Sequence, residues 1–468
     1  MVRFKNQLLI ALAAILSSAS FAPLSLWFTA PIAYAIYVKV LLNGRNQVWN
    51  SFLFAFLANA IILSWSKSFV GVTPWILLAI LQGFYLIPVG ILARYVKNPI
   101  VLIAAIILAD EVKSLFPFGG FGWSRVAFSQ ADSPLVKLVS LFGVTFLSVA
   151  TLAISLLLLQ PKALNFSLVT LLLLAASFPL NQESSGEGLK IRAVQGGVPE
   201  RGLSFNSRAQ AVLDNHITRT RSDSDESDQL ILWPENAIDV DPLRNVLVKE
   251  KLQNLQQEIR IPILAGAILD GRVLSNAAIL FSKNGNPEST YIKRYLTPFG
   301  EYIPLRSIAS IISPHTDRVT DFTPGSELVV HEVNQIKISS IICYEILNNR
   351  IIRESAMSSG LLAVITNSAT FSGSAEGEQQ LNITRIRAIE AGRNIVSVST
   401  TGPSAFISYD GTIISRLDDG EVGSLSERIE VRNNQTLALR YGELFTSLVI
   451  LFSLVLITVA LMRRRSSS

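Results

Sequence analysis

The sequence predicts a membrane domain of several α-helices joined to an α/β layered domain outside the bilayer. Half of its 468 residues are hydrophobic and only 16% are charged, a composition too apolar for an ordinary soluble protein. Long apolar runs fill the chain up to about Leu180 and return from Leu444, while the middle carries most of the charge. These shifts predict a membrane domain at 1–180, an α/β domain at 181–443, a last helix at 444–462 and a basic cytoplasmic tail at 463–468.

Eight segments are predicted to span the membrane. A helix that crosses about 30 Å of hydrocarbon needs roughly 20 apolar residues, and the first and fifth of these segments are short by that criterion. The predicted spans lie near residues 7–21, 25–42, 50–66, 74–93, 99–112, 135–158, 164–180 and 444–462. Seven spans before the middle domain place that domain and the N-terminus on opposite faces of the membrane.

Basic residues between the spans predict the orientation. Lys and Arg in short loops mark the cytoplasmic side, and most of them fall on one face of the eight-span arrangement, including Arg3, Lys39, Arg94 and the run Arg463, Arg464, Arg465. Lys67, Lys113 and Arg125 fall on the other face. We therefore expect residues 181–443 to be extracytoplasmic. The first 20 residues are interpreted as a signal anchor, because further spans follow directly.

Charge and cysteine content restrict the partners and the redox chemistry. The isoelectric point is about 9.2, but the basic residues are scattered or flank the spans, so contact with anionic lipid is favoured over nucleic acid. The single cysteine excludes a disulfide within the chain, although an extracytoplasmic domain would face an oxidising compartment.

The middle domain alternates buried strands with amphipathic helices. Segments rich in Ile, Val and Leu and bounded by Gly, Pro or Asn predict strands at residues 189–198, 230–236, 261–269, 273–282, 336–346 and 361–369. Apolar residues at helical spacing predict helices at residues 242–260 and 376–395. Alternation of this kind predicts a layered α/β domain large enough for a full core.

The only cysteine lies in the stretch IICYEI, inside one of these predicted strands. A buried strand cysteine usually behaves as a small inert hydrophobic residue. Tyr344 and Glu345 follow it directly and are costly to bury, so we expect the strand to leave the core at Cys343. A thiol at the end of a sheet is a candidate nucleophile if a neighbouring group removes its proton.

The proton acceptor could be a histidine or a carboxylate. The chain has three histidines, none in a recognisable Cys-His pattern, although spatial proximity stays open: His216, His315 and His331. The stretch LILWPEN ends a strand with Glu235, whose pKa could be raised toward that of a thiol. The stretch YIKRYLTPFGEYIP presents Lys293 on an amphipathic strand and Glu301 after a Pro-Phe-Gly turn.

Together, WPEN, YIKRYLTPFGEYIP and ICYEI resemble the bacterial apolipoprotein N-acyltransferases, membrane enzymes of the nitrilase superfamily. The stretches ADEVKSLFPFGGFGWSRVAFSQADSPLVKLVSLFGV and VQGGVPERG also resemble segments of that family. The three motifs occur in the family's order, between seven predicted spans and one. The resemblance implies a nitrilase-like α-β-β-α sandwich for residues 181–443 and a multi-pass location in the bacterial plasma membrane.

The resemblance also implies roles for individual residues. Glu235 would be the general base, Lys293 would stabilise the oxyanion and Cys343 would be the nucleophile, while Glu301, Tyr344 and Glu345 would support them. The implied reaction moves an acyl chain from a membrane phospholipid, through a Cys343 thioester, to the N-terminal amine of diacylglyceryl-cysteine in apolipoproteins. It implies no cofactor and no metal.

The chain departs from the family pattern around the expected substrate cleft. Ser368 and Thr370 follow Asn367 where many members have an acid and an indole, Gly197 replaces Asn, and Phe205 stands where some members have Trp. These changes affect the predicted cleft lining and substrate preference. Residues 298–314 mix apolar residues with turn formers, so they are hypothesised to form a lid.

Other interpretations stay open from the sequence. Glu235 could cap a helix, Lys293 could be exposed on a strand and Glu301 could serve a turn. The helix face formed by Arg385, Arg387, Glu390 and Arg393 is interpreted as solvated or structurally paired. A membrane-anchored amidase or nitrilase could use the same three residues with water as acceptor, and a non-catalytic protein could bind lipoproteins or sugar-transfer partners.

Overall fold

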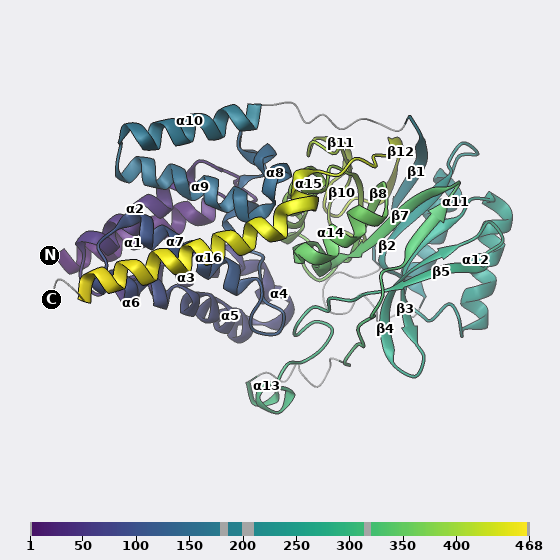
Figure 1. Ribbon diagram of the computed structural model, residues 1–468. Helices are drawn as coiled ribbons and strands as arrows, with labels where there is room; N and C mark the ends of the chain where they lie inside the picture. The colour runs from purple at the N-terminus through teal and green to yellow at the C-terminus, as the bar shows by residue number, and fades with distance from the viewer. Residues whose placement is uncertain (1, 178–185, 199–209, 313–319, 466–468) are drawn as a thin grey trace. The chain divides into compact units, whose positions relative to one another are not determined.

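A computed structural model describes residues 2–177, 186–198, 210–312 and 320–465 of the chain. The chain divides into two compact units: Met1–Leu180 with Thr436–Ser468, and Asn181–Gln435. Figure 1 shows that the first unit is built from helices and that the second contains the strands. Each unit is described by itself below.

The first unit contains helices and no strands in the part that the structure describes. Its α-helices are α1 (Val2–Ala19), α2 (Thr29–Asn43), α3 (Gln47–Ile62), α4 (Lys67–Val70), α5 (Val72–Tyr85), α6 (Ile87–Tyr95), α7 (Pro99–Lys113), α8 (Val139–Phe142), α9 (Val144–Leu159), α10 (Ala163–Ser177) and α16 (Leu437–Arg465). Local signals explain several boundaries. At the start of α7 the Asn98 side chain accepts from the Ile100 and Val101 amides, and Pro99 occupies the first helical position.

Two of the described helical segments are long and apolar enough to cross a membrane: Val72–Tyr95, with mean hydropathy 2.2, and Leu437–Arg464, with mean hydropathy 2.7. They cover the predicted spans at 74–93 and 444–462. Other predicted spans coincide with shorter apolar helices, such as α3 and α9, of 16 residues each. Sixteen residues extend over about 24 Å, less than the hydrocarbon thickness. The eight-span arrangement therefore stays a prediction.

The span predicted at 135–158 is not one continuous helix. A short 3₁₀ turn, Val136–Leu138, leads into α8, and Gly143 with a φ of 83° separates α8 from α9. A residue with positive φ cannot continue a right-handed helix, and glycine adopts this conformation without a steric penalty. Hydropathy does not reveal the break, because the residues on both sides of Gly143 are apolar.

Buried charges link α7 to the segment that follows it. Lys113 Nζ lies 2.9 Å from Asp110 Oδ1 and donates to the Ser124 carbonyl at 2.7 Å. Arg125 is fully buried and pairs with Glu111. Lys113 and Arg125, assigned from sequence to the outer loops, are thus neutralised by carboxylates, which explains why they do not follow the bias of the other loop charges.

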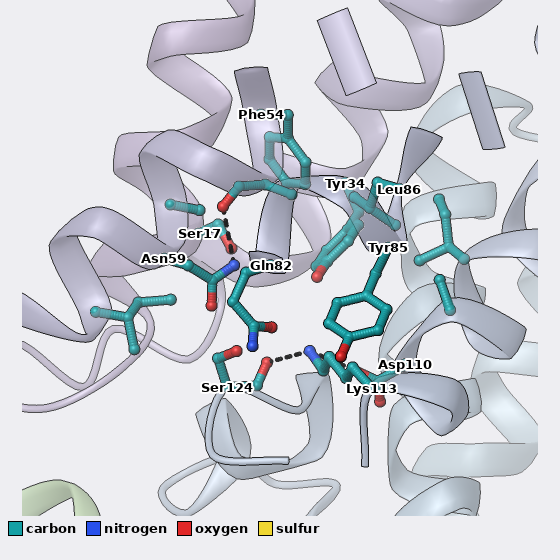
Figure 2. Close-up of a pocket in the computed structure, with 15 residues that line it drawn as sticks. Ser17, Tyr34, Phe54, Asn59, Gln82, Tyr85, Leu86, Asp110, Lys113 and Ser124 are labelled. Atoms are coloured by element: carbon teal, nitrogen blue, oxygen red, sulfur yellow. Dashed lines mark hydrogen bonds and ion pairs between the residues drawn. The ribbon is translucent and has the colours of Figure 1, made fainter. Parts of the chain in front are cut away.

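A small polar cavity of about 40 Å³ lies among these helices, and Figure 2 shows the side chains that surround it. Gln82 is buried, and neither amide atom has a hydrogen-bond partner within the described residues. Figure 2 shows its amide between Asn59, which donates to the Ala55 carbonyl at 2.9 Å, and Ser124. The volume can hold at least one water molecule. The helices around this cavity therefore turn polar side chains toward one another.

The described strands of the second unit form two six-stranded sheets. The first has the order β12 (Gly423–Glu430), β1 (Gly188–Gln195), β2 (Leu230–Ile238), β3 (Ile263–Asp270), β4 (Leu274–Phe281) and β5 (Pro287–Ile292). The second has the order β11 (Ile413–Leu417), β10 (Ser404–Ile407), β9 (Asn394–Ser399), β8 (Leu361–Thr366), β7 (Ile336–Ile342) and β6 (Val330–Val333). Strands β1, β2 and β3 pair in parallel, as do β7, β8 and β9.

Helices cover the outer face of each sheet (Figure 1). They are α11 (Ala211–Asp223) and α12 (Val246–Ile259) on the first sheet, and α14 (Asn349–Ser358) and α15 (Glu376–Ala391) on the second; α13 (Arg306–Ile312) lies apart. Strand β2 shows how the sequence builds the layers: Leu232 joins the core between the sheets, whereas Trp233 joins the core under α11 and α12. Successive strand residues face opposite sides, so both must be apolar. The result is an α-β-β-α sandwich.

The strands predicted at 189–198, 230–236, 261–269, 273–282, 336–346 and 361–369 correspond to β1, β2, β3, β4, β7 and β8. The helices predicted at 242–260 and 376–395 correspond to α12 and α15, the latter ending at Ala391 before β9 begins at Asn394. The prediction for 336–346 is wrong in its second half. Strand β7 ends at Ile342, and Cys343–Leu347 forms a 3₁₀ turn.

Candidate active site

Glu235 lies on an irregular stretch of β2. The register between β2 and β3 shifts between Trp233 and Ile238, and Asn236 has a φ of 57°. The irregularity needs space on the neighbouring strand, where a Cβ on Gly266 would lie 2.4 Å from the Pro234 carbonyl oxygen and 2.5 Å from the Glu235 Cα. Glycine in β3 therefore permits the β2 bulge, and such bulges commonly redirect a functional side chain.

Lys293 follows the last residue of β5 and is almost fully buried between two carboxylates. Its Nζ lies 3.1 Å from Glu235 Oε1 and 2.8 Å from Glu301 Oε2. The alternative of an exposed strand lysine is therefore wrong. A buried ammonium is costly unless it is paired, and here two acidic partners stabilise the charged form.

Asn276 joins the two carboxylates from the middle of β4. Its Nδ2 donates to Glu235 Oε1 at 2.6 Å and to Glu301 Oε1 at 2.8 Å. The sequence analysis did not select this residue. A signal was present, because Asn276 is a polar side chain inside the otherwise apolar strand VLSNAAILFS, and buried polar groups usually have a specific partner.

The charges divide the two carboxylates into different roles. Burial raises the pKa of Glu235, and the negative charge of Glu301 raises it further, although Lys293 opposes both effects. The pKa of Glu301 is lowered despite burial, because the ammonium of Lys293 and the Thr297 amide stabilise its anion. Burial opposes the charge of Lys293, but the two glutamates raise its pKa. Of this pair, Glu235 is therefore the carboxylate that more readily accepts a proton.

Cys343 lies directly after β7 and begins the 3₁₀ turn. Its φ is 47°, a left-handed conformation that costs a non-glycine residue on the order of 1–3 kcal/mol. Cys343 as a whole residue is partly exposed. Burial raises the pKa of this thiol well above its ordinary value, as do the charges of Glu235 and Glu376, whereas Lys293 lowers it. The sulfur is therefore protonated at neutral pH, and activation requires a nearby base.

Glu345 and Tyr344 are buried, contrary to the expectation that they would lie outside the core. The Glu345 carboxylate accepts hydrogen bonds from the Tyr291 hydroxyl at 2.8 Å and from three backbone amides: Arg294 at 2.7 Å, Tyr295 at 3.1 Å and Ile342 at 2.9 Å. These donors replace the hydration that the Glu345 carboxylate loses on burial. The chain can therefore change direction at Cys343 while the side chain of Glu345 stays buried. Glu345 ties the turn after β7 to the segment after β5.

Two arginines of the helix face assigned to solvent or to structural pairing are buried. Arg387 on α15 is 0% exposed, and Arg393, between the end of α15 and the start of β9, is 2% exposed. Arg387 pairs with Glu390 at 2.5 Å and donates to the Ile346 and Leu347 carbonyls at 2.8 and 3.0 Å. Of the two alternatives given for this helix face, solvated or structurally paired, Arg387 is structurally paired. Arg387 fixes the end of the turn that Cys343 begins.

The same helix brings two further residues to the thiol that the sequence analysis did not select. Gln380 is buried, and its Nε2 lies 3.7 Å from Cys343 Sγ. Glu376, one turn earlier, is 3% exposed, accepts a hydrogen bond from Ser368, and has a pKa that burial raises to about 7. The sequence contained one signal for this pair: Glu376 and Gln380 are four residues apart, and residues with that spacing lie on the same face of a helix.

The histidines that the structure describes contact other groups. His216 accepts from the Gly196 amide at 3.2 Å, and His331 lies 2.7 Å from the Ser289 hydroxyl. Burial lowers the pKa of each to about 4. His315 falls outside the described residues. Within the described ranges, no group of three or more His, Cys, Asp or Glu side chains is arranged to hold a metal ion.

Of the departures from the family pattern, Ser368 adjoins the retained Asn367 and lies in this neighbourhood. Asn367 accepts from the Thr400 hydroxyl at 2.8 Å and from the Ala369 amide at 3.1 Å. Ser368, which replaces an acid of that pattern, is hydrogen-bonded to the Glu376 carboxyl group. Phe205 lies outside the described residues, as do residues 313 and 314 of the hypothesised lid.

Two family models match the chain. Residues 13–157 match the apolipoprotein N-acyltransferase N-terminal domain, and residues 190–433 match carbon-nitrogen hydrolase. The second match covers more than half of the chain and coincides with the α-β-β-α sandwich and its buried Glu-Lys pair. The chain belongs to the carbon-nitrogen hydrolase family.

Several curated proteins are similar to this chain over most of its length. The chain is 29% identical over 493 residues to an apolipoprotein N-acyltransferase of Mycolicibacterium smegmatis, covering 95% of this chain and 83% of that protein. It is 29% identical to the enzyme of that name from Azotobacter vinelandii, covering 88% and 86%, and 28% identical to the one from Shewanella oneidensis, covering 95% and 93%. A crystal structure of an amidase from Nesterenkonia sp. is 18% identical with a TM-score of 0.42, covering 56% of this chain and 97% of that one.

These similarities test several predictions. The resemblance to the apolipoprotein N-acyltransferases is confirmed, as are the nitrilase-like fold of the middle domain and the prediction that the protein is an enzyme of the acyltransferase class. The assignment of roles to Glu235, Lys293 and Cys343 stays a prediction, as does the number of membrane spans.

Proposed function

We propose that the protein transfers an acyl chain from a membrane phospholipid, through a thioester on Cys343, to the N-terminal amine of diacylglyceryl-cysteine in apolipoproteins. The observation that carries the proposal is the buried cluster of Glu235, Lys293 and Glu301, which interacts electrostatically with a strained cysteine. It occurs in a chain whose N-terminal part matches the apolipoprotein N-acyltransferase N-terminal domain.

In the first half-reaction, Glu235 takes the proton from the Cys343 thiol. The thiolate then attacks the carbonyl carbon of the phospholipid ester. Lys293 and the backbone amide that follows Cys343 stabilise the negative oxygen that develops. When the tetrahedral intermediate collapses, Glu235 returns the proton to the departing alcohol oxygen. Lysophospholipid leaves, and the acyl chain remains as a thioester.

In the second half-reaction, the neutral acceptor amine attacks the thioester carbonyl. A new carbon–nitrogen bond forms and the carbon–sulfur bond breaks. Glu235 accepts the proton that the nitrogen loses and passes it to the departing sulfur of Cys343, which regenerates the thiol. Because the acyl group leaves one substrate before it reaches the other, the kinetics should be ping-pong.

The proposal gives the apolar helices a function. Both substrates are lipids or carry lipid anchors, so the enzyme must act at a bilayer. We propose that residues 1–180 and 444–462 form the eight predicted spans in the bacterial plasma membrane and that residues 181–443 lie on the extracytoplasmic face. The helix α16 begins at Leu437, seven residues before the predicted span. Residues 298–314 stay a hypothesis for the lid.

Mass spectrometry of a diacylglyceryl-cysteine peptide tests the proposal. The purified protein, wild type or Cys343→Ala, is incubated with phospholipid and peptide. Gain of one amide-linked acyl chain with the wild type alone supports the transferase. Release of free fatty acid without peptide acylation would instead indicate water as acceptor, as in an amidase-like hydrolase. Equal peptide binding by both proteins with no chemistry would favour the non-catalytic alternative.

A further inference from the structure

Glu376 is a buried acid that the proposed mechanism does not use. It is the first residue of α15 and is 3% exposed, and its Oε2 atom has no hydrogen-bond partner within the described residues. The Ser368 hydroxyl bonds to the carboxyl group. A buried carboxyl oxygen without a partner is costly, because it has lost hydration without replacement. Such a group in a native site needs a function that compensates for that cost.

The helix places this acid beside the nucleophile. Gln380 lies four residues after Glu376 and therefore on the same helix face, and its Nε2 lies 3.7 Å from Cys343 Sγ. The charge of Glu376 also raises the pKa of the Cys343 thiol, so the two groups interact through space. By contrast, Glu378 on the same helix pairs with Arg416 at 2.8 Å, where both side chains are about one-third exposed.

We propose that Glu376 binds the ammonium group of the incoming acceptor and removes the proton that must leave before the amine can attack the Cys343 thioester. The inference rests on the proposed function, because it assigns the binding site of the second substrate. It makes Glu376 specific to the second half-reaction, whereas Glu235, Lys293 and Cys343 serve both.

The proton balance requires a group of this kind. An α-amine has an ordinary pKa of about 8, so at neutral pH most acceptor molecules carry an ammonium that cannot attack a carbonyl. Glu376 takes one proton from the ammonium and releases it to solvent. The resulting amine attacks the thioester, and the second proton that its nitrogen loses passes through Glu235 to the departing Cys343 sulfur.

The groups around Glu376 suit this task. Burial raises its pKa to about 7, and the charges of Glu235 on β2 and Asp419 between β11 and β12 act in the same direction. Cys343, directly after β7, interacts with it electrostatically. A general base works best with a pKa near the working pH. The carboxyl groups that act on Glu376 through their charge also attract a cationic amine, although the ammonium of Lys293 beside Glu235 opposes this attraction.

Single-turnover experiments with full-length protein in detergent micelles can test this role. The acyl-enzyme is formed with a labelled phospholipid, and its decay is followed after adding diacylglyceryl-cysteine peptide or hydroxylamine, a small nucleophile that is neutral at pH 7. The variants are Glu376→Gln, which keeps the size of the side chain, and Glu378→Gln as the matched control on the same helix.

We expect Glu376→Gln to form acyl-enzyme no more slowly than the wild type, because loss of the Glu376 charge lowers the pKa of the Cys343 thiol. It should react with hydroxylamine at the wild-type rate but transfer to the peptide roughly 100-fold more slowly. The wild-type transfer rate should rise with pH through an inflection near 7 that is absent in Glu376→Gln, while Glu378→Gln behaves as wild type. Unchanged peptide transfer, or an equal loss of all three rates, would overturn the inference. Failure of the wild type to form any acyl-enzyme would contradict the proposed function itself, and the inference with it.

Discussion

Lys293 Nζ lies 2.8 Å from Glu301 Oε2 and so fixes the position of this carboxylate in the site. The charge of Glu301 in turn raises the pKa of Glu235. One ammonium therefore faces two carboxyl groups. The pKa of Glu301 is lowered while that of Glu235 is raised. Because the neighbours of Glu235 change its pKa in different directions, replacing Glu301 and replacing Asn276 should shift the pH profile of acylation in opposite directions.

Replacing Glu301 with Gln should shift the acid limb of the acylation pH profile to lower pH. The negative charge of Glu301 raises the pKa of Glu235, so its removal leaves Glu235 paired with Lys293 alone and easier to ionise. We also expect the maximal rate to fall on the order of tenfold or more, because Lys293 loses one of the groups that position it. Single-turnover acylation against pH measures both effects. A limb that moves to higher pH would contradict this account of the cluster.

Replacing Asn276 with Leu should shift the same limb the other way. The Asn276 amide stabilises the anions of both Glu235 and Glu301, and leucine offers a similar volume without a donor. The pKa of Glu235 should therefore rise, and acylation should require a higher pH. The pair Glu301→Gln and Asn276→Leu forms its own control, because general damage to the site would lower both rates without moving the two profiles apart.

Glu345→Gln should destabilise the catalytic unit and slow acylation. Four donors converge on this buried carboxylate, and an amide would direct its NH₂ group at one of them. A buried donor left without an acceptor costs about 1–3 kcal/mol. Thermal unfolding and the acylation rate check the effect beside Glu332→Gln, which changes an exposed side chain on β6. Equal melting temperatures for the two variants would mean that these hydrogen bonds contribute little.

His331 should make stability depend on pH. Burial lowers its pKa from 6.5 to about 4 in the folded protein, so between these values the unfolded chain binds a proton that the folded protein does not. The contribution of neutral His331 to the free energy of unfolding is therefore complete above about pH 6.5 and is lost as the pH falls toward 4. At pH 5 roughly 2 kcal/mol of it is lost. The test is the change in melting temperature between pH 7 and pH 5, for wild type and His331→Gln. Other titrating groups affect both proteins, so a change no smaller in the variant would refute the prediction.

Arg125→Met should destabilise the helical unit, because it leaves the buried carboxylate of Glu111 without its cation. Removing one member of a buried pair typically costs about 3–5 kcal/mol, whereas replacing both members with apolar residues is often tolerated. We expect a large fall in melting temperature in detergent, and substantial recovery in Arg125→Met with Glu111→Leu. Arg350→Met, which removes an arginine side chain that is 78% exposed, is the control. A double variant no more stable than Arg125→Met would argue against unpaired charge as the cause.

The sequence by itself determined most of the strands of the sandwich and the positions of the motif residues within them. Uninterrupted apolar runs such as LLAVIT mark strands buried on both faces, and this pattern is local. The motif order Glu235, Lys293, Cys343 was also visible without a structure. Hydropathy identified the apolar helices, but it could not show the break at Gly143, because a change in φ leaves composition untouched.

Tertiary structure alone decided which polar groups meet. Asn276 bridges Glu235 and Glu301 because three separate segments converge, and Glu345 can be buried because Tyr291 and backbone amides supply donors from another segment. The side chains of α15 reach Cys343 only through the packing of that helix on the second sheet. Periodicity specifies which face of an element is apolar. The partner of a buried polar side chain depends on distant segments that must fold around it before its lost hydration is replaced.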